Sequence, residues 1–184
     1  MNKLLVVVDM QNDFIDGSLG TPEAQAIVQK VVDKIQSWDG FIFYTMDSHN
    51  ASTYLNSLEG QRLPVGHCLE GSNGILLNKD VEDCFRRVRR RVIRPYYKHT
   101  FGCTQLASQI LDHYDVIEIV GLCTDVCVVS NALLLRSYCP NMPIVVDASC
   151  CAGTTPEAHE AALQVMQSCQ IDIINWGEDE RCDF

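Results

Sequence analysis

Basic residues are scarce in this sequence. Its 14 lysines and arginines stand against 24 aspartates and glutamates, which gives a formal net charge of −10 at pH 7. Nucleic acids and anionic membranes select basic surfaces, so this charge balance argues against both as partners. We therefore expect the chain to act on a small molecule.

Long hydrophobic runs and a recognisable targeting segment are also absent. The apolar run near the N-terminus is interrupted by Asp9, and no apolar stretch reaches the roughly 20 residues that span a bilayer. The expected location is the cytoplasm. A hydrophobic fraction of 47% still allows a substantial core, which excludes a disordered or fibrous chain. We predict a single domain over residues 1–184.

No C-x-x-C pair occurs among the ten cysteines, which argues against a structural zinc site. Most of these cysteines lie in apolar segments, where a free thiol behaves as a small hydrophobic side chain. We expect buried thiols rather than disulfides. A glycine-rich dinucleotide fingerprint is missing too, because Gly17 and Gly20 follow the first predicted strand without the required spacing.

Apolar runs alternate with amphipathic segments along the whole chain. Strands are predicted over residues 4–8, 41–46, 88–94, 116–121, 144–146 and 171–174. Helices are predicted over residues 24–35, 81–85, 104–113, 125–137 and 156–168, with Thr21, Thr124 and Thr155 as N-caps. This alternation predicts an α/β fold: three α/β/α layers around a six-stranded, mostly parallel sheet of Rossmann-like topology.

Two segments fall outside this alternation. Residues 47–74 form a long connection with little periodicity, which is typical of functional loops. The tail from Gly177 to Phe184 is expected to be loose. Six of the 14 cations cluster between Arg86 and Arg94, and such a run can mark a polyanion site. On an acidic chain, a solvated helix end and sheet edge, or a salt-bridged oligomer contact, explains the run more simply.

Chemically active side chains follow four of the predicted strands. Asp9 ends the first strand, Asp47 and His49 follow the second, Lys98 follows the third, and Cys127 lies just past the fourth. Ligands of open parallel α/β sheets bind at the carboxyl ends of the strands. We therefore expect these five side chains to converge on one edge of the sheet.

A cysteine nucleophile is the chemistry that this set favours. Cys127 lies near the start of a predicted helix, where free backbone N–H groups and the helix dipole favour a thiolate, and Cys123 is its rival. Asp9 beside Lys98 offers a proton acceptor for the thiol. His99 is an alternative base, but in an extended segment its side chain should point away from that of Lys98.

Three segments resemble the signatures of the isochorismatase-like cysteine hydrolases, with nicotinamidases as the nearest group: Asp9-Met-Gln-Asn-Asp13-Phe14, Lys98-His-Thr-Phe-Gly and Gly121-Leu-Cys-Thr-Asp-Val-Cys127-Val. The resemblance covers residues 3 to about 175. It implies that Cys127 is the nucleophile, Asp9 the general acid and base, and Lys98 the cation that positions and polarises them. It also implies a cis Leu122–Cys123 peptide, backbone N–H groups of Cys123 and Cys127 as the oxyanion hole, and a homodimer or homotetramer.

Asp47, His49 and the later His67 offer a mixed oxygen and nitrogen ligand set. From the residues alone, the first two could simply hydrogen-bond their loop. The resemblance implies instead one bound divalent metal ion, because nicotinamidases use such a triad. This ligand set does not choose among Zn, Fe and Mn. Glu59 is a candidate for a further ligand.

The substrate-facing residues depart in part from the nicotinamidase pattern. Pro64 stands where these enzymes commonly carry a tryptophan, three residues before the second histidine. Phe14 matches their ring-facing aromatic residue, and Leu19 and Tyr54 are expected to add apolar walls.

The resemblance implies a cysteine-dependent amidohydrolase that cleaves a small carboxamide through a thioester acyl-enzyme, with nicotinamide converted to nicotinate and ammonia as the leading reaction. Another small amide or a ureido compound is the alternative substrate. A non-catalytic small-molecule-binding member would be expected to have lost part of the Asp9, Lys98 and Cys127 set. Vinyl-ether hydrolysis of isochorismate uses no nucleophilic cysteine, so Cys127 and the histidines count against it.

Overall fold

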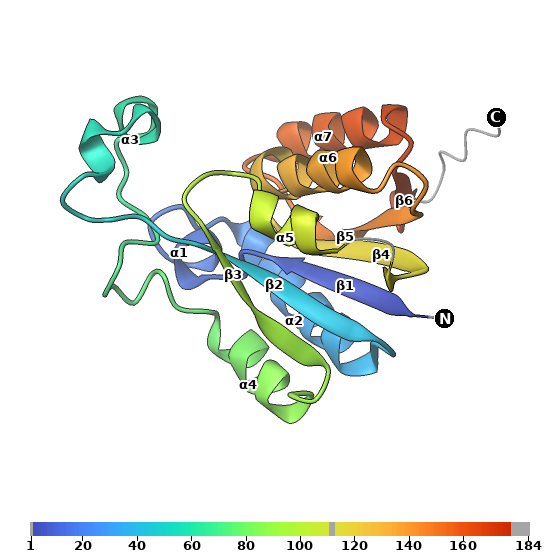
Figure 1. The fold of residues 1–184 in the computed structure, drawn as a ribbon. Coiled ribbons are helices and arrows are strands. Elements are labelled where there is room, and N and C mark those ends of the chain that lie inside the picture. The colour runs from blue at the N-terminus through green and yellow to red at the C-terminus, as the bar shows by residue number, and fades with distance from the viewer. Residues whose placement is uncertain (1, 111–112, 178–184) are drawn as a thin grey trace.

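A computed structural model describes residues 2–110 and 113–177 of the chain. One sheet of six strands forms its centre, in the order β3-β2-β1-β4-β5-β6, and each neighbouring pair is parallel. The strands are β1 (Lys3–Val8), β2 (Phe41–Asp47), β3 (Val92–Lys98), β4 (Val116–Leu122), β5 (Ile144–Ala152) and β6 (Asp172–Ile174). Helices cover both faces of the sheet (Figure 1), which confirms the predicted three-layer α/β fold.

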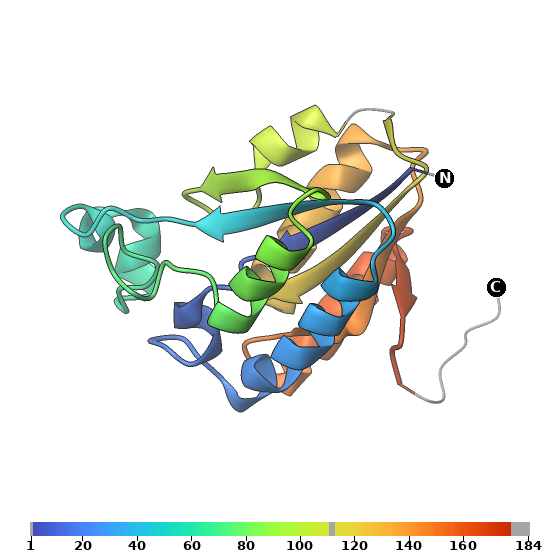
Figure 2. The same cartoon turned by 90° about the horizontal axis from the view of Figure 1, so that it is seen from below.

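The helices divide between the two faces of the sheet (Figure 2). One layer holds α1 (Asn12–Ile15), α2 (Pro22–Ser37) and α4 (Lys79–Arg87), and the other holds α5 (Thr104–Gln109), α6 (Val129–Tyr138) and α7 (Pro156–Ser168). The central strand β1 contributes Leu4, Val6 and Val8 to one core and alternate residues to the other, as the two-residue period of a strand buried on both faces requires. No helix among the described residues is long and apolar enough to cross a membrane.

Two of the three predicted helix caps are confirmed. The Thr21 hydroxyl accepts a hydrogen bond from the Ala24 N–H (3.0 Å), and the Thr155 hydroxyl accepts one from the Ala158 N–H (3.1 Å). The prediction for Thr124 is wrong. Its hydroxyl instead lies 2.8 Å from Nδ1 of His159 on α7, because the strand β4 delivers Thr124 into the buried contact with that helix rather than to an exposed helix start.

The segment after β4 also differs from a regular helix. Residues Thr124–Val128 form a π-helical turn, in which the Val128 N–H bonds to the Cys123 carbonyl, before the regular α6 begins. The strand predicted over residues 88–94 is shifted by four residues. Val88 is the C-cap of α4, where its N–H donates to the Cys84 carbonyl, and the Arg91 N–H closes a turn back to the Val88 carbonyl.

The long connection over residues 47–74 contains short helices that the sequence pattern did not indicate. These are a 3-10 turn at Tyr54–Asn56 and α3 (Leu58–Arg62), and α3 stands away from the body of the sheet in Figure 1. The basic run lies at the exposed end of α4 and the start of the edge strand β3, as the simpler interpretation expected. Residues 178–184, which make up almost all of the expected loose tail, lie outside the described residues.

All nine cysteines in the described part of the chain are free thiols, and seven of them are buried. This agrees with the expectation of buried thiols rather than disulfides.

A charged cluster ties α2 to the sheet on the face opposite α7. Nζ of Lys34 lies 2.5 Å from a Glu118 carboxylate oxygen and 2.8 Å from Asp147 Oδ2. Asp147 is only 1% exposed, and its other oxygen accepts hydrogen bonds from Ser149 and Asn175. Burial alone would raise the pKa of Asp147, but the contact with Lys34, together with the hydrogen bonds from Asn175 and Ser149, lowers it overall. The ion pair between Lys34 and Asp147 therefore favours the folded state at neutral pH.

We predict that Lys34→Met lowers the free energy of unfolding by about 2 kcal/mol at pH 7, because it leaves the buried Asp147 carboxylate without its cation. A carboxyl group whose pKa is lower in the folded state stabilises the fold above its unfolded pKa, near 4, and this contribution is lost as the pH falls through the folded value. The difference in the free energy of unfolding between the variant and the unmodified protein should therefore become smaller below pH 4. Urea unfolding at pH 7 and pH 3.5 measures it, with the exposed Lys30→Met on the same helix as control.

Candidate active site

The structure brings Asp9, Lys98 and Cys127 together at the carboxyl edge of the sheet. Nζ of Lys98 lies 2.7 Å from Asp9 Oδ2 and 3.4 Å from Cys127 Sγ. All three residues are at most 5% exposed. The predicted convergence of residues from β1, β3 and the turn after β4 is therefore observed. Their catalytic roles remain predictions.

Asp9 is held in an unusual backbone conformation at the end of β1. Its φ is +46°, in the left-handed region that residues with a Cβ rarely adopt. The Thr45 hydroxyl donates to Asp9 Oδ1 at 2.6 Å and accepts from the Asp9 N–H at 3.2 Å. These bonds from β2 turn the carboxylate towards Lys98, and they leave Oδ2 to face the ammonium group.

Burial sets the proton affinities of this group. It raises the pKa of the Cys127 thiol well above its ordinary value; the Asp9 carboxylate adds to this effect, and Lys98 opposes it. Burial also raises the pKa of Asp9, although Lys98 lowers it in part. Burial would lower the pKa of Lys98, but Asp9, Cys127 and Asp47 raise it overall. The resting set is therefore a neutral thiol beside an ammonium group and a carboxylate of increased basicity.

The nucleophile candidate is also fixed from the side of the β3–α5 loop. The side chain of Asn131, 1% exposed, donates to the Cys127 carbonyl at 2.8 Å and to the Phe101 carbonyl at 3.3 Å. Its Oδ1 accepts from the Cys103 N–H at 2.9 Å. Sequence reasoning did not single out this residue, because an asparagine inside a helical pattern carries no sign of its tertiary partners.

The rival groups lie differently from the leading candidates. Nδ1 of His99 donates to the Ser48 carbonyl at 2.6 Å, and His99 does not line the cavity that Cys127 borders. Cys123 is half-buried and borders the same cavity as Cys127. Burial raises the pKa of its thiol to about 12, whereas the sulfur in contact with Nζ of Lys98 is that of Cys127. The expected cis Leu122–Cys123 peptide is present.

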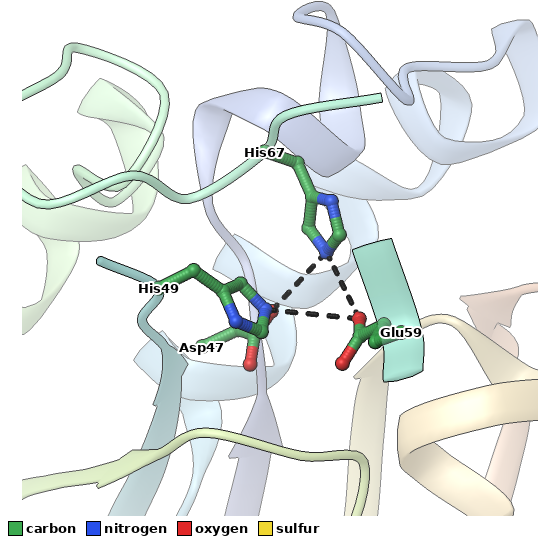
Figure 3. Close-up of side chains that lie close together, drawn as sticks. All are labelled: Asp47, His49, Glu59 and His67. Atoms are coloured by element: carbon green, nitrogen blue, oxygen red, sulfur yellow. Dashed lines mark hydrogen bonds and ion pairs between the residues drawn. The ribbon is translucent and has the colours of Figure 1, made fainter. Parts of the chain in front are cut away.

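Four side chains form a cluster, as Figure 3 shows: Asp47, His49, Glu59 and His67. Three of them, Asp47, Glu59 and His67, line the same cavity as Cys127. Nε2 of His49 lies 2.9 Å from Asp47 Oδ2 and 3.7 Å from Glu59 Oε1. Nε2 of His67 lies 3.5 Å and 3.4 Å from the same two oxygens. Two donor atoms that share one ion at about 2.1 Å stand roughly 3–3.5 Å apart, so these side chains fit a metal site.

The surroundings of the cluster support this fit. Burial alone would lower the pKa of His67. Hydrogen bonds with Asp47 and Glu59 outweigh this effect and raise the pKa to about 10. The two carboxylates therefore favour a positive charge at this point, which a proton or a divalent ion supplies. Nδ1 of His67 is 3.0 Å from the Val65 carbonyl, which orients the ring as the outer contacts of metal-bound histidines do. Glu59, a candidate from sequence, joins the cluster from α3.

Asp47 connects the two groups of side chains. Its Oδ2 faces the histidines, while its Oδ1 lies 3.3 Å from Nζ of Lys98. The Asp47 carboxylate contacts both the histidines and Lys98, and Lys98 contacts the Cys127 sulfur. These contacts fix the position of the four-residue cluster relative to the thiol. A short parallel bridge between His49 and Leu69 returns the long connection to β2, and this brings His67 beside His49.

A cavity of about 320 Å³ opens above the thiol and the cluster. Phe14 and Leu19 line it, as predicted for substrate contacts. The expectation for Tyr54 is wrong: its ring packs behind His49 and His67, at centroid distances of 5.0 and 5.3 Å, and its hydroxyl donates to the Leu63 carbonyl. The sequence analysis missed several further lining residues, namely Thr21, Leu63, Phe101, Val126 and Thr154.

One of the missed residues, Phe101, had a signal in the sequence, and Thr154 is positioned by a tertiary contact. Phe101 belongs to the Lys98 motif and provides an aromatic wall, although the tryptophan position is Pro64. Thr154 is held by Asp125, whose carboxylate accepts from the Thr154 N–H at 2.8 Å and from its hydroxyl at 2.6 Å. The turn that carries Cys127 thus also positions Thr154 in the wall of the cavity.

Comparison with known proteins identifies the family. The isochorismatase domain model matches residues 3–178, and the chain belongs to the isochorismatase domain family. The nicotinamidase of Saccharomyces cerevisiae is 24% identical over 215 residues, which cover 94% of this chain and 99% of that protein. These findings confirm the predicted family and its nearest group.

Solved structures show the same fold. The crystal structure of nicotinamidase/pyrazinamidase PncA from Bacillus subtilis has a TM-score of 0.78 and 24% identity, and the match covers 94% of this chain and 99% of that one. The pyrazinamidase of Pyrococcus horikoshii, solved in complex with zinc, has a TM-score of 0.74 and 24% identity, with 96% and 100% of the chains covered.

We predict that His49→Ala combined with His67→Ala removes a stoichiometric divalent metal from protein purified without chelator, and that Glu59→Gln weakens its binding. Ligation needs neutral imidazoles, so occupancy should fall as the pH is lowered and protons compete with the ion for the histidine nitrogens. Elemental analysis of dialysed protein measures both effects. The exposed His113→Ala is the matched control. Equal metal content in all four proteins would contradict the site.

Proposed function

We propose that this chain is a cysteine-dependent amidohydrolase that cleaves a small carboxamide, with nicotinamide as the leading substrate. The observation that carries the proposal is the buried contact of Lys98 with both Asp9 and Cys127, directly below a cavity that also borders the Asp47, His49, Glu59 and His67 cluster. The presence of Asp9, Lys98 and Cys127 in mutual contact supports an enzyme over a non-catalytic binding protein.

The first half of the reaction forms an acyl-enzyme. Asp9 takes the proton of the Cys127 thiol, and the sulfur attacks the carboxamide carbon. The raised pKa of Asp9 makes its carboxylate a stronger base for this transfer. The backbone N–H groups of Cys123 and Cys127 stabilise the oxyanion. Asp9 then returns the proton to the amide nitrogen, the C–N bond breaks, and ammonia leaves a thioester.

The second half releases the acid. Asp9 takes a proton from water, whose oxygen attacks the thioester carbon, and the Cys127 sulfur leaves and recovers the proton. Lys98 keeps its charge throughout, because its pKa is raised well above the ordinary value, and it balances the carboxylate and the transient thiolate. A divalent ion held by the neighbouring cluster would supply Lewis-acid binding of a ring nitrogen or of water.

Nicotinamide fits these features best. The yeast and Bacillus proteins described above are named nicotinamidases, and the Pyrococcus protein is a pyrazinamidase in complex with zinc. Phe14 and Phe101 supply aromatic walls to a cavity of about 320 Å³, which is the size range of small-molecule sites. Another small amide or a ureido compound remains the alternative substrate, since Pro64 replaces the usual tryptophan.

We predict that Cys127→Ala lowers ammonia release from nicotinamide at least ~10³-fold without changing the thermal unfolding midpoint, because it removes the attacking sulfur. Cys123→Ala, the matched control, should keep most of the activity, since only its backbone N–H is assigned a role. Ammonia release by metal-loaded protein measures both. Loss of activity in Cys123→Ala together with turnover in Cys127→Ala would reverse the assignment.

We also predict that Asp9→Asn and Lys98→Met each lower kcat about a hundredfold or more, and that their effects are not additive. The two side chains share one proton-transfer step and one buried ion pair, so the second substitution has little left to remove. Single-turnover rates of the two single variants and the double variant test this. Rate losses that multiply in the double variant would show two independent sites.

A further inference from the structure

A second cavity, of about 540 Å³, adjoins the one above the thiol. The two cavities share four wall residues: Glu59, Leu63, Phe101 and Val126. The inner cavity, with Cys127 in its wall, is the place for the amide. The outer cavity contains neither Cys127 nor Phe14 in its lining. A bare ring carboxamide would therefore occupy the inner cavity and leave the outer one without a function.

The outer cavity has the cation of Arg62 in its wall, on an acidic protein, together with the carboxylate of Glu59. Arg62 and His99 line it together with the Thr100 side chain and the apolar Leu58. Among the described residues Arg62 forms no ion pair, although the chain has 24 acidic side chains and a net charge of −10. Nδ1 of His99 is occupied by the Ser48 carbonyl, which leaves Nε2 as the ring nitrogen without a described partner.

Tight packing of α3 determines the position of Arg62. Gly60 packs so closely that a Cβ there would lie 2.0 Å from the Tyr54 carbonyl oxygen, and the Tyr54 hydroxyl donates to the Leu63 carbonyl at 2.8 Å. These contacts fix α3 on both sides. Glu59 then faces the two histidines, as in Figure 3, and Arg62 follows it by nearly one helical turn at the outer cavity.

We infer that the outer cavity is a subsite for an anionic group on the substrate, so that the chain acts on carboxamides whose far end carries a carboxylate. This inference rests on the proposed amidohydrolase function. The amide occupies the inner cavity, an apolar spacer crosses Leu63, Phe101 and Val126, and the anion meets the guanidinium group of Arg62. The planar donors of arginine bind a carboxylate in two parallel hydrogen bonds.

The negative charge of Glu59 does not prevent this arrangement. Its Oε1 lies 3.4 and 3.7 Å from the His67 and His49 nitrogens, so the carboxylate is directed towards the cluster. Arg62 is exposed, and exposed ion pairs contribute modestly and weaken with salt. We therefore expect a preference of about tenfold rather than absolute specificity.

The test compares two substrates that differ in charge and by one methyl group: a pyridine-3-carboxamide with a short carboxyalkyl chain on the ring, and its methyl ester. Ammonia release by metal-loaded protein gives kcat/KM for each, and the ratio of acid to ester is the readout. We expect a ratio of about 10 in the unmodified protein, about 1 in Arg62→Gln and an intermediate value in Arg62→Lys. The ratio should also fall when the salt concentration is raised.

Arg87→Gln is the matched control, because Arg87 is an exposed cation on α4 and does not line either cavity. Its acid-to-ester ratio should equal that of the unmodified protein. A ratio near 1 in the unmodified protein, or a ratio that survives in Arg62→Gln, would overturn the inference while leaving the amidohydrolase intact. No ammonia from any carboxamide, nicotinamide included, would contradict the proposed function itself.

Discussion

The buried ammonium group of Lys98 is the interaction on which the candidate site depends. It stands 2.7 Å from Asp9, 3.3 Å from Asp47 and 3.4 Å from the sulfur of Cys127, at the end of β3. Two carboxylates buried this close together would repel each other strongly without a cation between them. The ammonium group thus makes it possible for the carboxylates of Asp9 and Asp47 to lie buried at one edge of the sheet.

The residues around this ammonium group come from neighbouring strands of the sheet. Asp9, Asp47 and Lys98 come from the adjacent strands β1, β2 and β3, and Cys127 comes from the turn after β4, on the other side of β1. Parallel pairing aligns the ends of these strands, so the site is a consequence of the sheet order. The turn after β4 is in turn fixed by Asn131, by Asp125 with Thr154, and by Thr124 with His159.

The long connection after β2 supplies the side chains of the candidate site that do not come from the ends of the strands. It returns His67 to the cluster, contributes Glu59 and Leu63 to the cavity walls, and places Arg62 at the outer cavity. Tyr54 serves this segment as a support: its ring stands behind both histidines and its hydroxyl holds the end of α3. Tyr54, which the sequence suggested as a wall of the substrate site, therefore supports the two histidines instead.

The sequence by itself determined the sheet, the helix starts at Thr21 and Thr155, and the meeting of Asp9, Asp47, His49, Lys98 and Cys127, because periodicity and strand-end position are local properties. Only the tertiary structure decided the start of β3 at Val92, the partner of Thr124, and the place of Tyr54. It also decided which residues of the 47–74 connection face the cavity. These features depend on contacts between segments far apart in the chain, and no local pattern of side chains encodes such contacts.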